Sequence, residues 1–442
     1  MTAEPTAETN FTAPDAALAG QKVPLPGHHG HEGRPYDPAK VEGVRAQFPI
    51  LQEKVNGQPL VFLDSAASAQ KPDMVIDAMG EAARHCYANI HRGLHSMSER
   101  TTAAYEGVRR DVARFINAPD ARSVVFTANS TAAMNLLAHS YGATMAPGQA
   151  ILISELEHHA NIVPWQMLRD RTGLELRVCP ITPEGDLDLD AYRKLLADGR
   201  VDLVSITHMS NVLGTVTPVG VLATMAHEAG ARIHIDASQS IVHQPLDVQA
   251  LDVDFMSFTG HKLYGPTGVG VLWGRYDLMQ ALPPFMGGGD MIRSVSFERS
   301  TWADTPHRFE AGTGPILEVI GLGAAIRFVE SIGMDWIHQH DQALVRHAQN
   351  VLGNLKGVQL LGQPKERGGV VSFTMEGAHP HDLAVLLDQQ GIAIRAGQHC
   401  AEPLVHKLGL QGTARASFGA YTTPAEIDAL GRGLERAHDL LN

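Results

Sequence analysis

The chain has 442 residues and a formal net charge of −13, with 44% hydrophobic and 19% charged residues. This length suits two domains, and the composition is that of a soluble globular enzyme. The acidic balance excludes nucleic acid as the main partner, because phosphate backbones bind clustered lysine and arginine. No run of about 18 apolar residues is present, so we expect no membrane partner either.

Residues 1–37 are rich in Ala, Pro, Thr, Gly and His and have almost no large aliphatic side chains, which predicts a disordered tail. The cluster at 27–31 could bind a metal, but we interpret it as part of a solvated tail. Cys86, Cys179 and Cys400 form neither a disulfide framework nor a close-spaced zinc motif. No basic segment precedes an apolar run at the N-terminus, so we expect a cytoplasmic protein without a metal site.

Ordered structure is expected to begin near residue 38 with a helix, because Val44, Phe48 and Leu51 have helical spacing. Seven short apolar runs then alternate with longer helical patterns. They cover residues 124–127, 151–153, 174–178, 203–206, 233–235, 255–258 and 269–272. This alternation predicts an α/β large domain, residues 38–316, with a seven-stranded, mostly parallel sheet. Its N-terminal segment is expected to pack on the small domain.

The remaining residues, 317–442, predict a smaller C-terminal α+β domain. It follows a Gly/Pro-rich stretch at 283–290 and opens with a helix over 317–332. Further strands are expected near 370–374 and 392–395, and further helices near 382–390 and 424–441.

Lys262 follows directly after an apolar strand, in the segment Ser257-Phe258-Thr259-Gly260-His261-Lys262. Open α/β sheets bind ligands at the carboxyl ends of their strands. A lysine there can form a Schiff base when burial or positive charge lowers its pKa, and the neighbouring hydroxyl and imidazole can hold a phosphate. Taken alone, the string is also typical of an ordinary loop.

A second strand, residues 233–235, ends in Asp236, and Gln239 follows three residues later. Pyridoxal phosphate (PLP) accepts electrons while its ring nitrogen is protonated, and an aspartate beside that nitrogen keeps the proton there. An aspartate at a strand end can instead cap the next helix. The lysine strand follows one unit later in the chain, so the pair favours a PLP site.

Further motifs occur in order along the chain. They are Leu63-Asp64-Ser65-Ala66-Ala67-Ser68, residues 157–165 (Glu-His-His-Ala-Asn-Ile-Val-Pro-Trp), Ser210-Asn211-Val212-Leu213-Gly214, residues 308–313 (Arg-Phe-Glu-Ala-Gly-Thr) and residues 395–401 (Arg-Ala-Gly-Gln-His-Cys-Ala). With them, residues 37–442 resemble the group II (SufS-type) cysteine desulfurases of the class V aminotransferase fold family. The resemblance implies the PLP-dependent transferase fold type I. It also implies conversion of L-cysteine to L-alanine, with the sulfur passing to an enzyme cysteine as a persulfide for iron–sulfur cluster assembly.

The resemblance also implies the roles of the residues around the cofactor. Lys262 would carry PLP and act as acid and base at the substrate Cα. His159 would stack on the ring, Asp236 would pair with the ring nitrogen, and Gln239 would bond the phenolic oxygen. The phosphate would be held by Thr131, Thr259 and His261, with Thr313 from the partner subunit of a homodimer. The substrate-binding residues would be Asn211, Arg395 and Arg415.

Cys400 would be the nucleophile that receives the sulfur. It stands beside Arg395 and His399, and nearby positive charge favours the thiolate. Cys179, in an apolar strand, and Cys86, near a helix end, are expected to be structural. A selenocysteine lyase or a cysteine/cystine lyase on the same fold is the alternative, but simple elimination needs no protein thiol. A further alternative is a sulfur-carrier scaffold in iron–sulfur assembly that docks partners but has no catalytic activity. The presence of Lys262, Asp236 and Arg415 argues against it.

The expected macromolecular partner is a sulfur acceptor of the SufE or SufU type. In relatives that work with the zinc protein SufU, a histidine matching His381 takes over a zinc ligand position. His381 could equally cap the helix that opens at Asp382 or lie in solvent, with SufE as the acceptor. Some cysteine desulfurases with long N-terminal tails enter encapsulin shells, so such a shell is a candidate partner of residues 1–37.

Overall fold

The computed structural model describes residues 36–441. The predicted tail lies outside the described residues apart from Tyr36 and Asp37. Its histidine cluster and its candidate role in encapsulin docking therefore lie outside them as well.

The helices are α1 (Pro38–Arg45), α2 (Asp73–His85), α3 (Ser96–Phe115), α4 (Ser130–Ser140), α5 (Val163–Thr172), α6 (Leu189–Leu196), α7 (Val219–Glu228), α8 (Tyr276–Ala281), α9 (Ile316–Ile332), α10 (Met334–Gly353), α11 (Pro380–Asp388), α12 (Glu402–Lys407) and α13 (Pro424–Leu441). The strands are β1 (Lys54–Val55), β2 (Gln58–Pro59), β3 (Val61–Phe62), β4 (Val124–Thr127), β5 (Ala150–Ser154), β6 (Glu175–Cys179), β7 (Val201–Thr207), β8 (Arg232–Asp236), β9 (Phe255–Thr259), β10 (Gly270–Gly274), β11 (Ile292–Val295), β12 (Ser300–Trp302), β13 (Val358–Leu360), β14 (Val370–Met375), β15 (Ile392–Ala393), β16 (Arg395–Gly397) and β17 (Thr413–Ser417).

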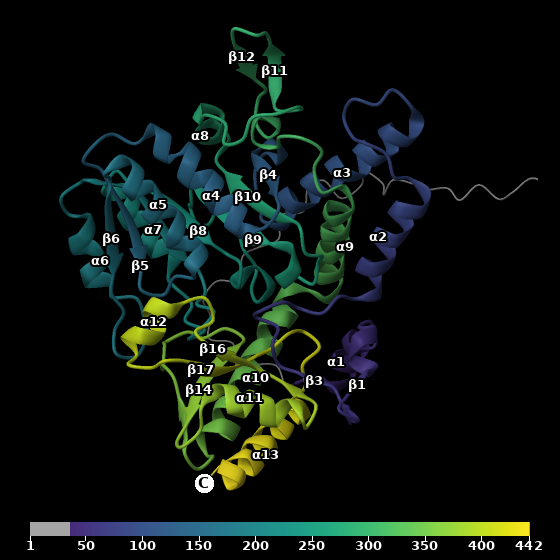
Figure 1. The fold of residues 1–442 in the computed structure, drawn as a ribbon, viewed down its shortest axis with the longest axis vertical. Helices are drawn as coiled ribbons and strands as arrows, with labels where there is room; N and C mark the ends of the chain where they lie inside the picture. The colour runs from purple at the N-terminus through teal and green to yellow at the C-terminus, as the bar shows by residue number, and fades with distance from the viewer. Residues whose placement is uncertain (1–35, 442) are drawn as a thin grey trace, which may run out of the picture. The chain divides into compact units, whose positions relative to one another are not determined.

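Seven strands form the central sheet in the order β4-β10-β9-β8-β7-β5-β6 (Figure 1). The strands from β9 to β6 are parallel, whereas β10 pairs antiparallel with both β9 and β4. The connection from β9 to β10 is too short for the crossover helix that a parallel pair requires, which accounts for this reversal. All seven predicted runs belong to this sheet, so the predicted seven-stranded, mostly parallel sheet is confirmed.

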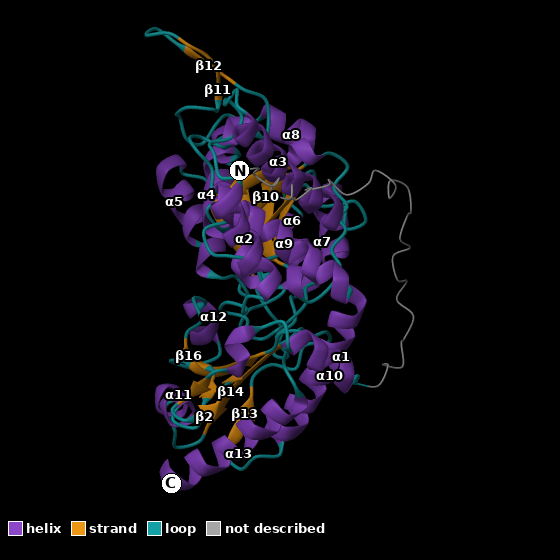
Figure 2. Ribbon diagram, turned by 90° about the vertical axis from the view of Figure 1, so that its right-hand side faces the viewer, coloured by secondary structure: helices purple, strands orange, loops and turns teal. Residues whose placement is uncertain are grey.

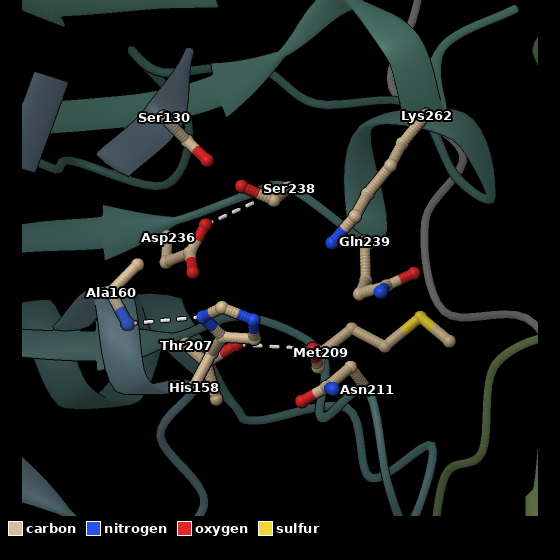
Figure 3. A pocket seen from close by; sticks show the side chains of 10 residues that line it. All are labelled: Ser130, His158, Ala160, Thr207, Met209, Asn211, Asp236, Ser238, Gln239 and Lys262. Atoms are coloured by element: carbon tan, nitrogen blue, oxygen red, sulfur yellow. Dashed lines mark hydrogen bonds between the residues drawn. The ribbon is translucent and has the colours of Figure 1, made fainter. Parts of the chain in front are cut away.

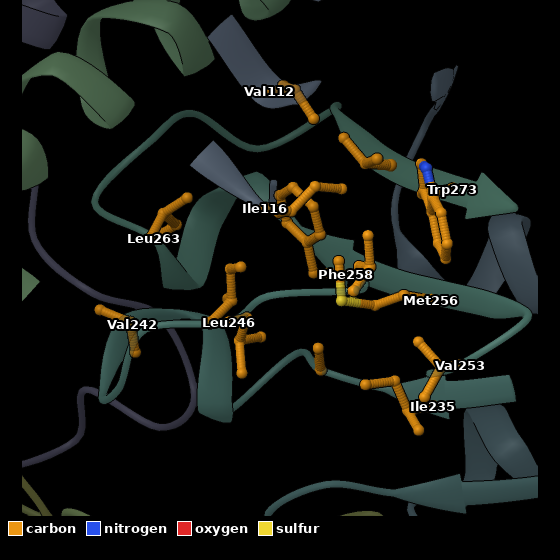
Figure 4. Packing of buried hydrophobic residues seen from close by; sticks show 14 of the residues in the cluster. Val112, Ile116, Ile235, Val242, Leu246, Val253, Met256, Phe258, Leu263 and Trp273 are labelled. Carbon is orange, nitrogen blue, oxygen red and sulfur yellow. The ribbon is translucent and has the colours of Figure 1, made fainter. Parts of the chain in front are cut away.

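Helices cover both faces of this sheet, because successive strand residues point to opposite sides. In β5, Ala150 and Leu152 join the core formed with α3, α6, α7 and α9, whereas Ile151 and Ile153 join the core formed with α4, α5 and α8. Figure 4 shows part of the first core, where β9 side chains meet those at the end of α3. Because helices bury both faces of the sheet, a ligand-binding site is expected at the carboxyl ends of the parallel strands, where polar residues follow.

Helix α9 packs along α2 and α3, and its residues Val319, Leu322 and Ile326 belong to the same core as the large sheet. The predicted helix at 317–332 is confirmed. Because this helix is covered by the large domain, we propose a division after Ile332 rather than at the expected residue 317.

The C-terminal residues form an antiparallel sheet in the order β13-β14-β17-β16, which shares one core with α10, α11 and α13 (Figure 2). The predicted smaller α+β domain is thus confirmed. The strand expected at 392–395 is instead two strands in different sheets, since β15 pairs with β3 and β16 pairs with β17. Strand β17 was not predicted, because its sequence Thr-Ala-Arg-Ala-Ser has no large aliphatic residue.

The N-terminal segment joins the two domains. Helix α1 ends at Arg45, before the Pro49–Gln52 3₁₀ turn, so the helical spacing that reached Leu51 does not continue as one helix. Phe48 is fully buried and makes edge contacts with three aromatic rings, those of Tyr264, Phe328 and Tyr421. These rings come from the large domain, from α9 and from the small domain, which fixes the path of the segment.

Candidate active site

A small pocket lies at the carboxyl ends of β7 and β8 (Figure 3). This is the edge at which parallel α/β sheets bind ligands. Its walls combine two charged side chains with several hydroxyl and amide groups. The lining residues are Ser130, His158, Ala160, Thr207, Met209, Asn211, Asp236, Ser238, Gln239 and Lys262.

Lys262 reaches the pocket from a 3₁₀ turn, Gly260–Lys262, that follows directly on β9. The turn is fixed because Gly260 N donates to Val269 O at 2.9 Å and Leu263 N donates to Gly260 O at 3.0 Å. Burial lowers the pKa of the Lys262 amine to about 8, although the nearby Asp236 carboxylate acts in the opposite direction. The amine is therefore available as a nucleophile and base near neutral pH.

Asp236 ends β8 and is almost fully buried at the same pocket. One carboxylate oxygen accepts a hydrogen bond from Ser238 N at 2.9 Å, so the side chain stabilises the turn after the strand. The negative charge of Asp236 also raises the pKa of Lys262, against the effect of burial. The structure thus brings together the lysine and the carboxylate that the sequence paired.

The imidazole in the pocket wall belongs to His158, not to the expected His159. His158 Nδ1 accepts from Ala160 N at 3.0 Å, which fixes the ring (Figure 3). Burial, with Lys262 acting in the same direction, lowers the pKa of His158 to about 3, so the ring is neutral. His158, and not His159, therefore faces the pocket. Two adjacent histidines give no sequence signal for which of them faces the sheet edge.

His159 lies against the Cys400 loop instead. Its backbone N–H donates to Cys400 O at 2.7 Å, and its Nε2 accepts from Glu402 N at 3.0 Å. These contacts join the large domain to the segment that carries the only cysteine exposed among the described residues.

The expected phosphate ligands lie near the N-terminus of α4 and at the end of β9. Ser130, the first residue of α4, lines the pocket, whereas Thr131 is exposed. Helix N-termini offer unpaired N–H groups to anions, so Ser130 is a further candidate that the sequence did not single out. His261 Nδ1 lies 3.2 Å from Ser68 Oγ, and burial lowers the pKa of His261 to about 4.

Several buried polar atoms around the pocket have no hydrogen-bond partner among the described residues. They include Ser238 Oγ, Thr259 Oγ1 and Arg415 Nε. Buried polar groups are rarely left unpaired, so such atoms mark places for a polar ligand. Gln239 is only partly engaged, since its Nε2 donates to Ala66 O at 2.9 Å.

Arg415 and Arg395 stand opposite each other on β17 and β16. Asp64 lies between them, with Oδ1 3.2 Å from Arg415 Nη2 and Oδ2 2.8 Å from Arg395 Nη2. Burial lowers the pKa of Arg415 to about 10, and the Asp64 carboxylate opposes this shift. Arg415 Nη1 also donates to Asn211 O at 2.9 Å. Asp64 belongs to the motif at residues 63–68, but the sequence analysis assigned it no role.

Cys400 is exposed on the short loop, residues 398–401, between β16 and α12. His399 and Cys400 both have left-handed backbones, with φ of 54° and 55°. This conformation costs non-glycine residues roughly 1–2 kcal/mol each. Asn211 Nδ2 holds the loop through His399 O at 2.7 Å. Cys400 lies close enough to Lys262 and Arg415 to influence the pKa of both.

Two expected residues lie apart from this group. Thr313 is exposed and donates to Asn89 Oδ1 at 3.4 Å rather than lining the pocket. His381 is exposed at the start of α11, and its N–H donates to His379 Nδ1 at 3.2 Å. His379, not His381, therefore caps this helix. Cys179 is buried, and Cys86 lies at the end of α2.

Within residues 36–441, no group of three or more His, Cys, Asp and Glu side chains is arranged to hold a metal ion. None of the helices in this range is long and apolar enough to cross a membrane.

Comparison with known proteins gives consistent matches. The class V aminotransferase family model matches residues 61–430. A cysteine desulfurase of Dickeya dadantii is 50% identical over 409 residues, which cover 92% of this chain and 99% of that protein. A probable cysteine desulfurase of Streptomyces coelicolor is 48% identical over 406 residues, covering 90% and 97%. The crystal structure of the cysteine desulfurase CsdA from Escherichia coli matches with a TM-score of 0.84 and 39% identity, covering 91% and 99%.

Proposed function

Because the chain belongs to the class V aminotransferase family, and within it to the cysteine desulfurases, we propose that its pocket removes the sulfur atom of L-cysteine. The products are L-alanine and a persulfide on Cys400, which supplies sulfur for iron–sulfur cluster assembly. One observation carries the proposal: Lys262 and Asp236 line one pocket, and Asn211 in its wall binds His399 O, directly before the exposed Cys400.

The polar atoms left unpaired at the pocket fit PLP. When bound, PLP supplies an aldehyde for a lysine amine and a ring that accepts electrons from the substrate Cα. Lys262 would hold the cofactor covalently, Asp236 would pair with its ring nitrogen, and Gln239 would bond its phenolic oxygen. His158 would lie against the ring in the place expected of His159. The phosphate group would be held by Ser130, Thr131, Thr259 and His261.

Arg415, Arg395 and Asn211 would bind the substrate carboxylate. Arg415 Nε is buried without a partner among the described residues, so a donor is available for a carboxylate oxygen. Asp64 holds the two guanidinium groups in place from the opposite side. Charge-assisted and bidentate hydrogen bonds of this kind also fix the orientation of the substrate.

The side chains then divide the chemistry between them. The neutral Lys262 amine takes the proton from the substrate Cα and returns a proton to the carbon that becomes alanine. The Cys400 thiolate attacks the substrate sulfur. A sulfur–sulfur bond forms as the carbon–sulfur bond breaks, and the released electron pair remains with the carbon, which is protonated. L-cysteine and one enzyme thiol thus give L-alanine and one enzyme persulfide. His158 is uncharged at neutral pH and serves as a flat wall of the pocket.

A homodimer is part of the proposal. Thr313 does not line the pocket of its own chain, and this is the arrangement required if it serves the phosphate site of a second copy. Exposed apolar side chains near the β11–β12 hairpin, including Val295 and Phe297, support a protein contact there.

A cytoplasmic location is also part of the proposal. The three cysteines are all free, which suits a protein that acts in the reducing cytoplasm.

The sulfur acceptor would be a protein of the SufE or SufU type that reaches the exposed Cys400. His381 Nε2 lies 3.8 Å from the point that a Cβ on Gly397 would occupy, so its ring is close to the Cys400 loop. Its ring is not the helix cap, because His379 has that role. An exposed imidazole beside the sulfur-carrying loop supports the zinc-exchange route with SufU.

The test compares two variants of the purified protein with the wild type. Cys400→Ala is expected to keep the yellow colour of bound PLP but to form little alanine and no persulfide. Lys262→Ala is expected to lose both the covalent attachment and alanine formation. Near-normal alanine formation by Cys400→Ala would overturn the proposal in favour of a lyase that releases sulfur without a protein thiol.

A further inference from the structure

The Cys400 loop depends on the large domain for its shape. Within the loop, Ala401 N donates to Gln398 O at 2.9 Å. Ala401 O also accepts from Val405 N of α12 at 3.1 Å, and three further hydrogen bonds at the backbone of residues 399–402 cross to the large domain. His159 N donates to Cys400 O at 2.7 Å, and Glu402 N donates to His159 Nε2 at 3.0 Å. The same histidine therefore holds the loop at Cys400 and at Glu402, whereas Asn211 Nδ2 holds it before the cysteine, at His399 O.

The loop needs such support because two successive residues, His399 and Cys400, have positive φ angles. Side chains with a Cβ adopt this conformation at an energetic penalty, and it persists where the surroundings enforce it. Released from its contacts, the backbone of Cys400 would relax toward ordinary conformations. The direction of the Cys400 side chain would change with it.

His159 is well placed to enforce the conformation, because it begins a 3₁₀ turn, His159–Asn161, that is anchored in the protein interior. Asn161 is fully buried and donates to Glu157 Oε2 at 2.7 Å and to Ser205 O at 3.1 Å. Trp165 Nε1 donates to Asn161 Oδ1 at 2.9 Å. The turn is thus part of the large domain, and it carries the hydrogen-bonding groups that meet the loop.

We infer that His159 is a positioning residue that holds the Cys400 loop so that the thiol faces the pocket. The neighbouring His158 and His159 then divide two tasks, since the first lines the pocket and the second fixes the loop. The inference rests on the proposed function, because it assigns a purpose to the direction of Cys400. The contact requires an unprotonated Nε2 as the acceptor.

The experiment uses the PLP-loaded protein and three variants. His159→Ala removes the side-chain acceptor, whereas His159→Gln can place an amide oxygen near the position of Nε2. His406→Ala is the matched control. This histidine is exposed on α12, and its Nε2 lies 3.7 Å from the side-chain Oε1 of Glu402 rather than at the backbone N of Glu402. The measurements are kcat and KM for L-cysteine with a small thiol reductant, the absorbance of bound PLP, and amide hydrogen exchange of residues 399–402.

His159→Ala is expected to lower kcat roughly tenfold, the usual effect of one lost hydrogen bond. KM should stay within about twofold, because the groups that bind the substrate carboxylate are unchanged. PLP absorbance should be retained, exchange at 399–402 should be faster, and His159→Gln should recover most of kcat. His406→Ala should match the wild type in all three measurements.

The inference is overturned if His159→Ala keeps wild-type kcat and exchange, if it loses PLP, or if His159→Gln is as slow as His159→Ala. The first result means that the loop needs no support from His159. Loss of PLP would mean that His159 acts through the cofactor. Equal rates for His159→Gln and His159→Ala would mean that a hydrogen-bond acceptor at the position of Nε2 is not what the loop needs. Failure of the proposed function looks different, since the wild type itself would then form no persulfide on Cys400.

Discussion

Asp64 Oδ1 lies 3.2 Å from Nη2 of the buried Arg415. The same carboxylate holds Arg395, which faces Arg415 across two antiparallel strands. Two guanidinium groups in cross-strand positions repel each other unless a negative charge stands near both. Asp64 supplies that charge from the N-terminal segment, so the proposed substrate site is built from both ends of the chain.

Replacing Asp64 by Asn should therefore weaken substrate binding. The amide keeps the shape of the side chain but loses its charge, so the two arginines move apart and lose their common orientation. We expect KM for L-cysteine to rise roughly tenfold, the value of about one charge-assisted hydrogen bond, with a smaller change in kcat. Asp77→Asn, an exposed position on α2, is the control. An unchanged KM in Asp64→Asn would show that Asp64 does not orient the arginines.

The lowered pKa of Lys262 predicts the pH dependence of PLP capture by the cofactor-free protein. A lysine reacts as the neutral amine, and a pKa of about 8 makes roughly 10% of it neutral at about pH 7 and roughly 90% at about pH 9. The rate of PLP attachment should rise about tenfold over this range and then level off. The control is Nα-acetyl-lysine mixed with PLP at each pH. A protein rate that rises about a hundredfold between about pH 7 and pH 9 and continues to rise beyond it would show an ordinary lysine.

Phe48 should be important for the stability of the whole chain. It is fully buried, and its ring centroid lies 4.8 Å from that of Tyr421 and 5.4 Å from that of Phe328. Phe48→Ala leaves a cavity where the N-terminal segment meets both domains, so the free energy of unfolding should fall by about 3–5 kcal/mol. Leu440→Ala, at an exposed position on α13, should change it by less than about 0.5 kcal/mol. Equal effects in the two variants would contradict this packing account.

His381 provides a test of the acceptor. If it takes over a zinc ligand position of SufU, His381→Ala should abolish stimulation by SufU and leave basal turnover unchanged. The neighbouring His379→Ala is the control, because His379 caps α11 through its Nδ1. Stimulation of the wild type and of His381→Ala to the same extent, or no stimulation of the wild type by SufU, would favour an acceptor of the SufE type.

The sequence predicted the parts of the fold that long apolar runs determine. All seven strands of the large sheet were identified, because each carries a short run rich in apolar residues, including the edge strand β6, in which Glu175 and Val178 are exposed. Strand β17 was missed although it carries Arg415, since alanine and serine pack there in place of large aliphatics. The proposed boundary after Ile332 could not be read from periodicity either. It depends on the contacts of α9 with α2 and α3, which are far apart in the sequence.

The candidate site was predicted where a motif fixes a strand end, as at Lys262 and Asp236. The sequence could not show that His158 rather than His159 lines the pocket, because this depends on which backbone position begins a 3₁₀ turn. Ser130 and Asp64 were not assigned a role for a similar reason. Each becomes a candidate only when a helix N-terminus or a second domain is brought beside the pocket.

The most direct test of the account is to locate the sulfur after a single turnover. The PLP-loaded protein is mixed with L-cysteine without reductant, alkylated, digested under non-reducing conditions and analysed by mass spectrometry. The account predicts one additional sulfur atom on the peptide that contains Cys400 and none on those of Cys86 and Cys179, with an equal amount of L-alanine. Alanine formed while Cys400 stays unmodified, or sulfur found on another cysteine, would contradict it.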